Sequence, residues 1–404
     1  MKINGIGSAL VDNLYSPVDF SSQEYRNWSA ENNNGRGIIT GGLVFKEDLE
    51  KPGGKPYRDI IEEIAGKNCT PRKNVGGPSI VTLIHVMQML GKEKISISYF
   101  GTRGDDENGR YLAERINSFS IDTGGYLIVE GQTPFTDVLI DPSYNQVGER
   151  SFITSSGTAE VLTGKDLPSS FFDADVLIFG GTALTTGIHD DLSMLLEKGH
   201  ASDCRTFVNT VYDFRNEKLH PDRCWPLVDA DRYYRMIDLL ITDNEEALRI
   251  SGQRTKEDAL DFFSSKGVGS VIITHGPQDI ACASNGTFFM GKGTFTMPVS
   301  HAVGEERKKL PPDILADTTG CGDNFAGGVY ASVIQQMGNG SGKLSLTQAV
   351  SWGIVSGGFT SLYEGGVYYE KTPGEKREKI EHLFAAYRKQ TGGNFEESGN
   401  FRSW

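Results

Sequence analysis

The feature that most constrains the fold is an alternation of short apolar runs with helical patterns through most of the chain. Apolar residues at successive positions are typical of strands that are covered on both faces in a parallel sheet. Such runs lie at 176–179, 206–208, 237–241 and 271–274, whereas residues 95–100 alternate apolar and polar side chains in the manner of a strand. Helical periodicity occurs at 79–90, 189–199, 244–251, 255–265 and 324–337. The alternation predicts an α/β fold with a doubly wound, mostly parallel sheet flanked by helices.

The segment 17–70 departs from this pattern. It is polar and rich in Gly and Asn around 31–37 and 51–56. A connection of this length is unusual within one domain and predicts an insertion or a lid. At the other end, a basic helix is expected over 375–389, followed by a polar tail.

Charge and composition exclude several classes of function. Forty Lys and Arg against 53 Asp and Glu give a formal net charge of -13, which disfavours nucleic acid as a partner. The N-terminus lacks the apolar stretch of a signal peptide, and no run approaches the roughly 18 to 20 apolar residues that span a bilayer. Five scattered cysteines and seven histidines show no zinc or redox spacing. We therefore expect a cytoplasmic protein without a membrane segment and with reduced thiols.

The segment with most chemical content is 317–323, Asp-Thr-Thr-Gly-Cys-Gly-Asp, which runs directly into a helical pattern. The backbone N–H groups of Gly320, Cys321 and Gly322 would converge at the start of that helix, where its dipole favours an anion. Asp323, at the same end, is placed to accept the proton of an attacking hydroxyl. We expect the helix start to keep this carboxylate ionised. The competing interpretation is an ordinary capped helix with an acidic first turn.

Residues 317–323 followed by 324–328, Asn-Phe-Ala-Gly-Gly, closely resemble the DTxGAGD signature of the ribokinase-like (PfkB) sugar and nucleoside kinases. The resemblance covers roughly residues 1–16 and 70–372. Cys321 departs from the small residue that is usual there, which a backbone donor should tolerate. In this family Asp323 would be the catalytic base, and the amides of Gly320, Cys321 and Gly322 would form the anion hole.

Two further segments resemble the family's acceptor site. Residues 5–12 look like its first strand, so Asp12 is implied as a ligand of substrate hydroxyls. A dinucleotide GxGxxG motif is excluded because Leu10 occupies the third glycine position. Gly76 and Gly77 resemble the di-glycine substrate loop, although Val81 or Thr82 replaces the asparagine that usually follows.

The resemblance also implies a site for ATP and Mg²⁺. Asp243 and Glu246 occupy the positions of the N-x-x-E motif, which organises magnesium through water. The same pair would also form a helix capping box, and the two roles are compatible. Thr274 and Gly276 resemble the T-x-G turn beside the nucleotide, with His275 an ordinary loop residue. Asp317 is implied as a possible ligand of a monovalent cation such as K⁺.

A P-loop lysine is excluded, since Met337 and Leu344 break the Walker A pattern around Gly342-Lys343. Arg150 follows Gly148-Glu149 in a stretch that matches the family's strands, and a surface salt bridge is favoured over substrate contact for it. We expect one kinase domain over 1–390 and a tail over 391–404. Residues 13–75 and about 98–155 would contribute an enlarged small β lid, through which the family often forms homodimers.

These observations predict an ATP-dependent kinase that phosphorylates a hydroxymethyl group of a sugar or sugar acid. Two alternatives stay open. One is a nucleoside kinase of the adenosine type, which the lid-side segment 17–70 favours. The other is a non-catalytic sugar-binding regulatory protein on the same fold, which the missing asparagine and the acidic residue at 243 permit.

Overall fold

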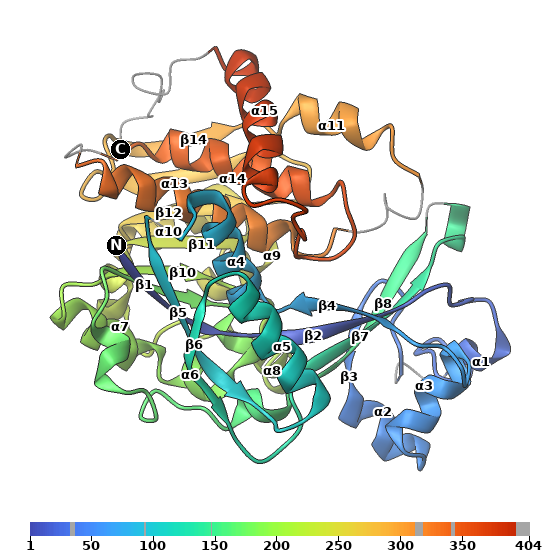
Figure 1. The fold of residues 1–404 in the computed structure, drawn as a ribbon. Helices are drawn as coiled ribbons and strands as arrows, with labels where there is room; N and C mark the ends of the chain where they lie inside the picture. The colour runs from blue at the N-terminus through green and yellow to red at the C-terminus, as the bar shows by residue number, and fades with distance from the viewer. Residues whose placement is uncertain (33–36, 93, 147, 312–317, 341–343, 393–404) are drawn as a thin grey trace.

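The computed structural model describes residues 1–404 except 33–36, 93, 147, 312–317, 341–343 and 393–404 (Figure 1). Its main feature is a nine-stranded sheet in the order β14-β13-β12-β11-β10-β9-β1-β5-β6. The seven strands from β6 to β12 in this order run parallel, and β13 and β14 complete the edge antiparallel. The strands are β1 (Lys2–Gly7), β5 (Ser96–Arg103), β6 (Asp122–Ile128), β9 (Val176–Gly180), β10 (Arg205–Asn209), β11 (Leu239–Asp243), β12 (Ser270–Thr274), β13 (Ile280–Asn285) and β14 (Lys292–Met297). The predicted doubly wound α/β fold is confirmed.

Helices cover both faces of this sheet, which explains its continuous apolar strands. On β9, Ile178 belongs to one hydrophobic core while Leu177 and Phe179 belong to the other, because side chains alternate along a strand. The helices are α4 (Pro78–Leu90), α5 (Glu107–Ser118), α6 (Thr186–Asp190), α7 (Leu192–Ala201), α8 (Phe214–Leu219), α9 (Asn244–Ser251), α10 (Lys256–Ser265), α11 (His301–Arg307), α13 (Cys321–Gly338), α14 (Leu346–Thr360) and α15 (Glu375–Gln390). The predicted helices at 79–90, 244–251, 255–265 and 324–337 are all present. No helix of the described ranges is both long and apolar enough to cross a bilayer.

A smaller five-stranded sheet, in the order β3-β8-β7-β2-β4, stands beside the main one (Figure 1). Its strands are β2 (Leu10–Tyr15), β3 (Leu43–Phe45), β4 (Arg72–Gly76), β7 (Phe135–Asp141) and β8 (Glu149–Ser155). The polar segment 17–70 contributes α1 (Gln23–Arg26), β3, α2 (Lys46–Gly53) and α3 (Tyr57–Ala65) to this part of the molecule. Short 3₁₀ turns lie at Tyr144–Gln146, Gly157–Glu160, Ser169–Phe172, Thr182–Leu184 and Asp231–Met236.

Two boundaries differ from those predicted. Residues 5–12 are not one strand: β1 ends at Gly7 in the large sheet, and Asp12 lies in β2 of the small sheet. Residues 98–155 do not all join the lid, since β5 and β6 pair in the large sheet and only β7 and β8 enter the small one. The alternation that identified β5 does not reveal which sheet a strand joins, because pairing partners are set by long-range contacts.

The two faces of the small sheet have different neighbours. Asp12 pairs with Thr136 and Asn13 with Asp137, so the first pair projects to one face and the second to the other. Helix α3 covers the face of Asn13 and Asp137, where the Tyr57 hydroxyl donates to the Asp137 carboxylate at 2.6 Å. The face of Asp12 is turned toward the start of α13, as the contacts of Arg150 show below.

Candidate active site

The start of α13 is built around a glycine that no other residue can replace without strain. Gly320 caps the helix with φ +74°, in the left-handed region. A Cβ at Gly320 would come within 2.5 Å of the Gly366 Cα, in the loop that follows α14. The glycine therefore allows the start of α13 and the 365–366 loop to touch.

The three amides predicted as an anion hole do not share one environment. The N–H of Cys321 donates to the carbonyl of Thr318 at 3.2 Å and so belongs to the turn. In the described part of the chain, the N–H groups of Gly320 and Gly322 have no hydrogen-bond partner. A Cβ at Gly322 would meet nothing within 4 Å, so this position faces open space. The structure thus leaves two amides, not three, to receive an anion at the positive end of the helix dipole.

Asp323 lies in the first turn of α13, beside these amides. Its side chain keeps partial exposure, but dense packing around the carboxylate desolvates it and raises its pKa to about 7. Desolvation by burial thus opposes the charge that the helix start was expected to stabilise on this carboxylate. A carboxylate that titrates near neutrality is suited to accepting a proton from an alcohol.

The residue after Asp323 is the centre of a buried polar network. The Asn324 side-chain Nδ2 donates to the carbonyls of Gly320 and Gly366, each at 2.8 Å. Its Oδ1 accepts from Lys376 Nζ at 2.8 Å and lies 2.7 Å from His85 Nδ1. Asn324 therefore ties the start of α13 to the 365–366 loop.

Lys376 reaches this network from α15 although it is fully buried. Its Nζ also donates to Gln88 Oε1 of α4 at 3.0 Å. Burial lowers the pKa of Lys376 to about 7, against the opposing effect of the Glu370 carboxylate. No sequence motif marks this residue, because its side-chain partners lie on two other helices, α4 and α13, and only the fold brings them together.

The predicted acceptor residues lie side by side. Asp12 on β2 pairs with Asn74 on β4, and a Cβ at Gly76 would come within 2.2 Å of the Asp12 carboxylate. Gly77 caps the N-terminus of α4 with φ +100°. The departure at Thr82 now has a structural reason: its hydroxyl donates to the Asp323 carbonyl at 3.0 Å, so it serves to position α13. Helix α4 thereby links the di-glycine loop to the start of α13.

The predicted magnesium pair lies at the carboxyl end of β11. Asp243 accepts from the Glu246 N–H at 2.8 Å, and Glu246 accepts from the Asp243 N–H at 3.2 Å, which is a complete capping box. Glu246 is buried and also accepts from the Thr210 hydroxyl. Burial and the nearby Asp243 raise the pKa of Glu246. Asp243 is exposed and the more accessible of the two oxygen donors, so the pair fits an ion held through water better than direct ligation by both residues.

The next strand places Thr274 opposite Asp243 in the register of β11 and β12. Gly276 follows with φ +51°, and a Cβ there would meet nothing within 4 Å. These residues and the Asp243–Glu246 pair share the edge where parallel strands end, which is where ligands bind in open α/β sheets. The described residues include no group of three or more His, Cys, Asp or Glu side chains arranged to hold a metal.

Arg150 is the residue whose surroundings differ most from those expected. It is buried at 8% exposure, and its guanidinium donates to the hydroxyls of Thr319 at 2.5 Å and Thr318 at 3.2 Å. The favoured surface position is therefore wrong. Arg150 lies on β8, so it joins the small sheet to the loop before α13. Asp317, the possible cation ligand, lies outside the described residues.

Comparison with known proteins places these features in one family. The model of the family described as pfkB family carbohydrate kinase matches residues 57–368, well over half of the chain. The 2-dehydro-3-deoxygluconokinase of Escherichia coli (strain K12) is 22% identical over 290 residues, which cover 68% of this chain and 85% of that protein.

Solved structures show the same fold. Adenosine kinase from Schistosoma mansoni in complex with 2-fluoroadenosine superposes with a TM-score of 0.67 at 17% identity, covering 91% of this chain and 97% of that one. A putative ribokinase II from E. coli in complex with ATP and Mg²⁺ gives a TM-score of 0.63 at 16% identity, covering 95% and 99%. With the family match over residues 57–368, the chain belongs to the pfkB family of carbohydrate kinases and is a phosphotransferase.

Proposed function

We propose that the chain transfers the γ-phosphoryl group of ATP to a hydroxymethyl oxygen of a sugar or sugar acid. One observation carries the proposal: the free amides of Gly320 and Gly322 lie beside Asp323, in contact with the helix that begins at the acceptor loop. The E. coli relative whose name specifies a 2-dehydro-3-deoxy sugar acid supports a sugar acid as acceptor.

The chemistry follows from the positions of these groups. Asp323 would accept the proton of the acceptor hydroxyl as that oxygen attacks the phosphorus. The amides of Gly320 and Gly322 would stabilise the charge on the transferring phosphoryl oxygens. Asp12 with Gly76 and Gly77 would hold the acceptor so that the attacking oxygen is aligned. Cys321 acts by shaping the turn, since its own amide is engaged within it.

The binding of ATP and Mg²⁺ is supported by the solved ribokinase relative that contains both. Asp243 and Glu246 would organise Mg²⁺ through water, and Thr274 and Gly276 would lie beside the nucleotide. The ion, when bound, neutralises charge on the phosphate oxygens. The role of Asp317 toward K⁺ stays a prediction.

A nucleoside acceptor is the second candidate, and one observation favours it. On the same face as Asp12, the small sheet presents an apolar cluster made of Leu14, Val138, Ile140 and Phe152. Leu14, Val138 and Ile140 are buried and Phe152 is partly exposed, and an apolar environment of this kind suits a planar base better than a polyhydroxylated chain. The likeness to adenosine kinase shows the fold and does not decide between the two acceptors.

The screen that tests the proposal measures acceptor-dependent ADP release over pentoses, ketohexoses, 2-keto-3-deoxy acids and nucleosides. Asp323→Asn protein serves as the blank. We expect turnover with at least one sugar or sugar acid. Turnover with adenosine and no free sugar would favour the nucleoside kinase, and calorimetric sugar binding without ADP release would favour a regulatory protein.

The cytoplasmic location and the homodimer formed through the lid both stay predictions. One face of the small sheet is covered by α3 of the same chain, which buries Ile60, Ile61 and Ile64. A lid-mediated contact would therefore have to use the edge strands or the outer surface of α1 to α3. Sedimentation of the purified chain measures its oligomeric state directly.

A further inference from the structure

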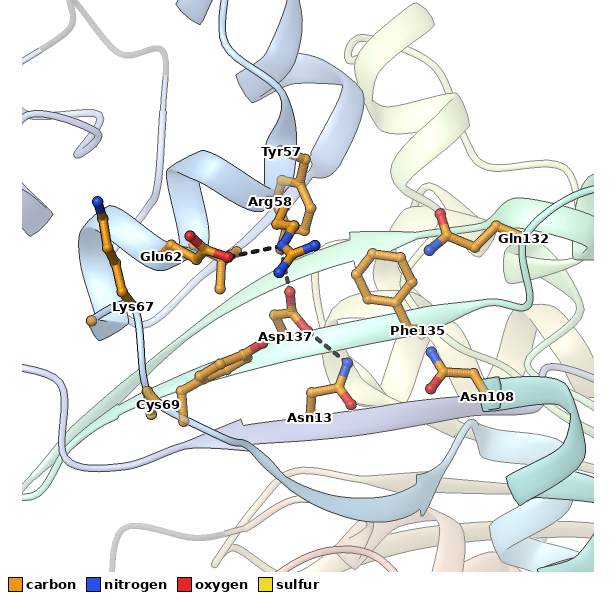
Figure 2. Close-up of a pocket in the computed structure, with 13 residues that line it drawn as sticks. Asn13, Tyr57, Arg58, Glu62, Lys67, Cys69, Asn108, Gln132, Phe135 and Asp137 are labelled. Carbon is orange, nitrogen blue, oxygen red and sulfur yellow. Dashed lines mark hydrogen bonds and ion pairs between the residues drawn. The ribbon is translucent and has the colours of Figure 1, made fainter. Parts of the chain in front are cut away.

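The reverse face of the small sheet lines a second cavity, which the sheet itself separates from the candidate active site. The cavity has a volume of about 340 Å³ and lies between α3 and the strands β2 and β7 (Figure 2). Asn13 and Asp137 line it, whereas their neighbours Asp12 and Thr136 project to the opposite face. A space of this size accommodates a small organic molecule.

The floor of the cavity contains a buried carboxylate. Asp137 is 3% exposed and accepts hydrogen bonds from Asn13 Nδ2 at 2.8 Å and the Tyr57 hydroxyl at 2.6 Å. Both donors are neutral, and Asp137 has no ion-pair partner within the described ranges. The Lys46 ammonium, which lies 5.6 Å from the Tyr57 ring centroid, favours the charged carboxylate, but burial still raises the pKa of Asp137 to about 6. A buried carboxylate without a paired cation is energetically costly.

Asn13 adds an acceptor that has no hydrogen-bond partner in the described part of the chain. Because its Nδ2 donates to Asp137, its Oδ1 must point elsewhere, and flipping the amide would set two acceptor oxygens against each other. This Oδ1 is buried and has no partner among the described residues, while Asn13 as a whole is 8% exposed. Within the described ranges, the floor therefore has one acceptor without a partner, Asn13 Oδ1, beside a carboxylate whose two oxygens each accept from one neutral donor.

The walls are aromatic. Tyr57 and Phe135 lie with their ring centroids 5.9 Å apart, and Tyr15 also lines the cavity. Aromatic faces attract organic cations, and they do so more strongly where water is excluded. At the rim, Arg58 pairs with Glu62 at 2.8 Å, so these two charges offset each other, and Lys67 is exposed there.

We propose that this cavity binds a small organic cation, a primary ammonium on an apolar body. The ammonium would donate to Asp137 and to Asn13 Oδ1, and the body would pack against Tyr57 and Phe135. A neutral hydroxylated ligand fits less well, because it would bring no positive charge to pair directly with the carboxylate. None of the groups assigned to phosphoryl transfer takes part, so this proposal stands independently of the proposed function.

The test is calorimetric titration of the full chain at pH 7.5 with benzylamine and, in parallel, with benzyl alcohol. The two probes share a ring and differ in the ammonium. We expect saturable one-site binding of benzylamine and at least tenfold weaker binding of the alcohol. Asp137→Asn should weaken benzylamine binding at least tenfold, and so should Asn13→Ala. Thermal unfolding of each variant checks its fold.

Two controls separate this site from the rest of an acidic protein. Asp105→Asn removes an exposed carboxylate elsewhere and should leave benzylamine affinity unchanged. Asp323→Asn should also leave it unchanged, so a failed kinase assignment would not affect this result. Equal binding of both probes, non-saturable binding, or unchanged affinity in folded Asp137→Asn protein would overturn the proposal. If neither floor variant folds, a crystal grown with benzylamine decides it by the presence or absence of the ligand in this cavity.

Discussion

At the scale of single residues, the candidate site depends on groups whose surroundings change their chemistry. Asp323 was predicted from its place in a motif, but the raised pKa comes from packing that no local pattern reveals. The burial and contacts of Arg150 could not be predicted from the sequence either, because its partners Thr318 and Thr319 lie far along the chain. Motifs therefore predicted most residues of the candidate site, while their protonation and contacts required the fold.

The pKa of Asp323 predicts how the rate depends on pH. A general base must be deprotonated, so kcat/KM for the acceptor should approach its plateau above about pH 8, reach about half of it near pH 7 and fall further as the pH decreases. At pH 5.5 we expect a rate roughly 30-fold below the plateau. Initial rates at saturating ATP measure this, and enzyme held at pH 5.5 and assayed at pH 8 controls for unfolding. A flat profile from pH 5.5 to 8 would contradict the role of Asp323.

Lys376→Met tests whether the buried network positions the start of α13. Loss of the ammonium removes one hydrogen-bond donor from Asn324 Oδ1, and we expect kcat to fall about tenfold with a smaller change in KM. The melting temperature should not decrease, because an apolar side chain of similar length replaces a buried charge. Lys379→Met, on the exposed side of the same helix, is the matched control. Unchanged kcat in both variants would rule out a positioning role for Lys376.

At the scale of elements, the sequence did not predict the strands β6, β13 and β14 of the large sheet, but it predicted β5, β9, β10, β11 and β12 and the helices α4, α9, α10 and α13. Their signals are local: buried parallel strands are apolar at successive positions, and glycine marks the ends of α4 and α9. The break between β1 and β2 was missed, since residues 5–12 carry no charge or proline before Asp12 to mark the passage between sheets. The turn at the start of α13 is present as predicted. The N–H of Cys321, however, donates to the carbonyl of Thr318 and is not available to an anion.

Two glycines only two residues apart should respond to alanine in opposite ways. Gly320→Ala places a Cβ against Gly366 at positive φ, so we expect a loss of unfolding free energy of roughly 1–3 kcal/mol. Gly322→Ala lies in open space within the first helical turn and should stabilise the helix by up to about 1 kcal/mol. Its methyl group would nevertheless enter the space proposed for the phosphoryl group. Denaturant unfolding should therefore show that Gly322→Ala is at least as stable as the unmodified chain, while its kcat/KM is lower. A stable variant with full activity would contradict the anion site.

At the scale of the whole molecule, the site forms where the two sheets meet. Arg150 of β8 in the small sheet donates to the loop that begins α13, and Asp12 of β2 lies on the same face of that sheet. The resemblance predicted a lid but assigned β5 and β6 to it, because hydrophobic patterns do not specify which sheet a strand joins. Only the fold shows that the reverse face of the lid is covered by α3.

Arg150→Lys tests the contact between the sheets. Lysine keeps the charge but lacks the planar guanidinium, whose two Nη atoms donate to Thr319 and Thr318 separately, so we expect kcat/KM to fall about tenfold. Arg110→Lys changes an exposed arginine paired with Asp105 and should have no effect. Steady-state kinetics on both variants supply the comparison. If Arg150→Lys were as active as Arg110→Lys and the unmodified chain, this contact would not contribute to turnover.

The most direct test of the account is acceptor-dependent ADP formation by Asp323→Asn. The substitution keeps the shape of the side chain and removes the carboxylate that would accept the hydroxyl proton. We predict a loss of roughly 10²- to 10⁴-fold in kcat, with the melting temperature preserved or raised, because a desolvated charge is removed. Activity within about tenfold of the unmodified chain would contradict the central claim that this carboxylate acts as the base.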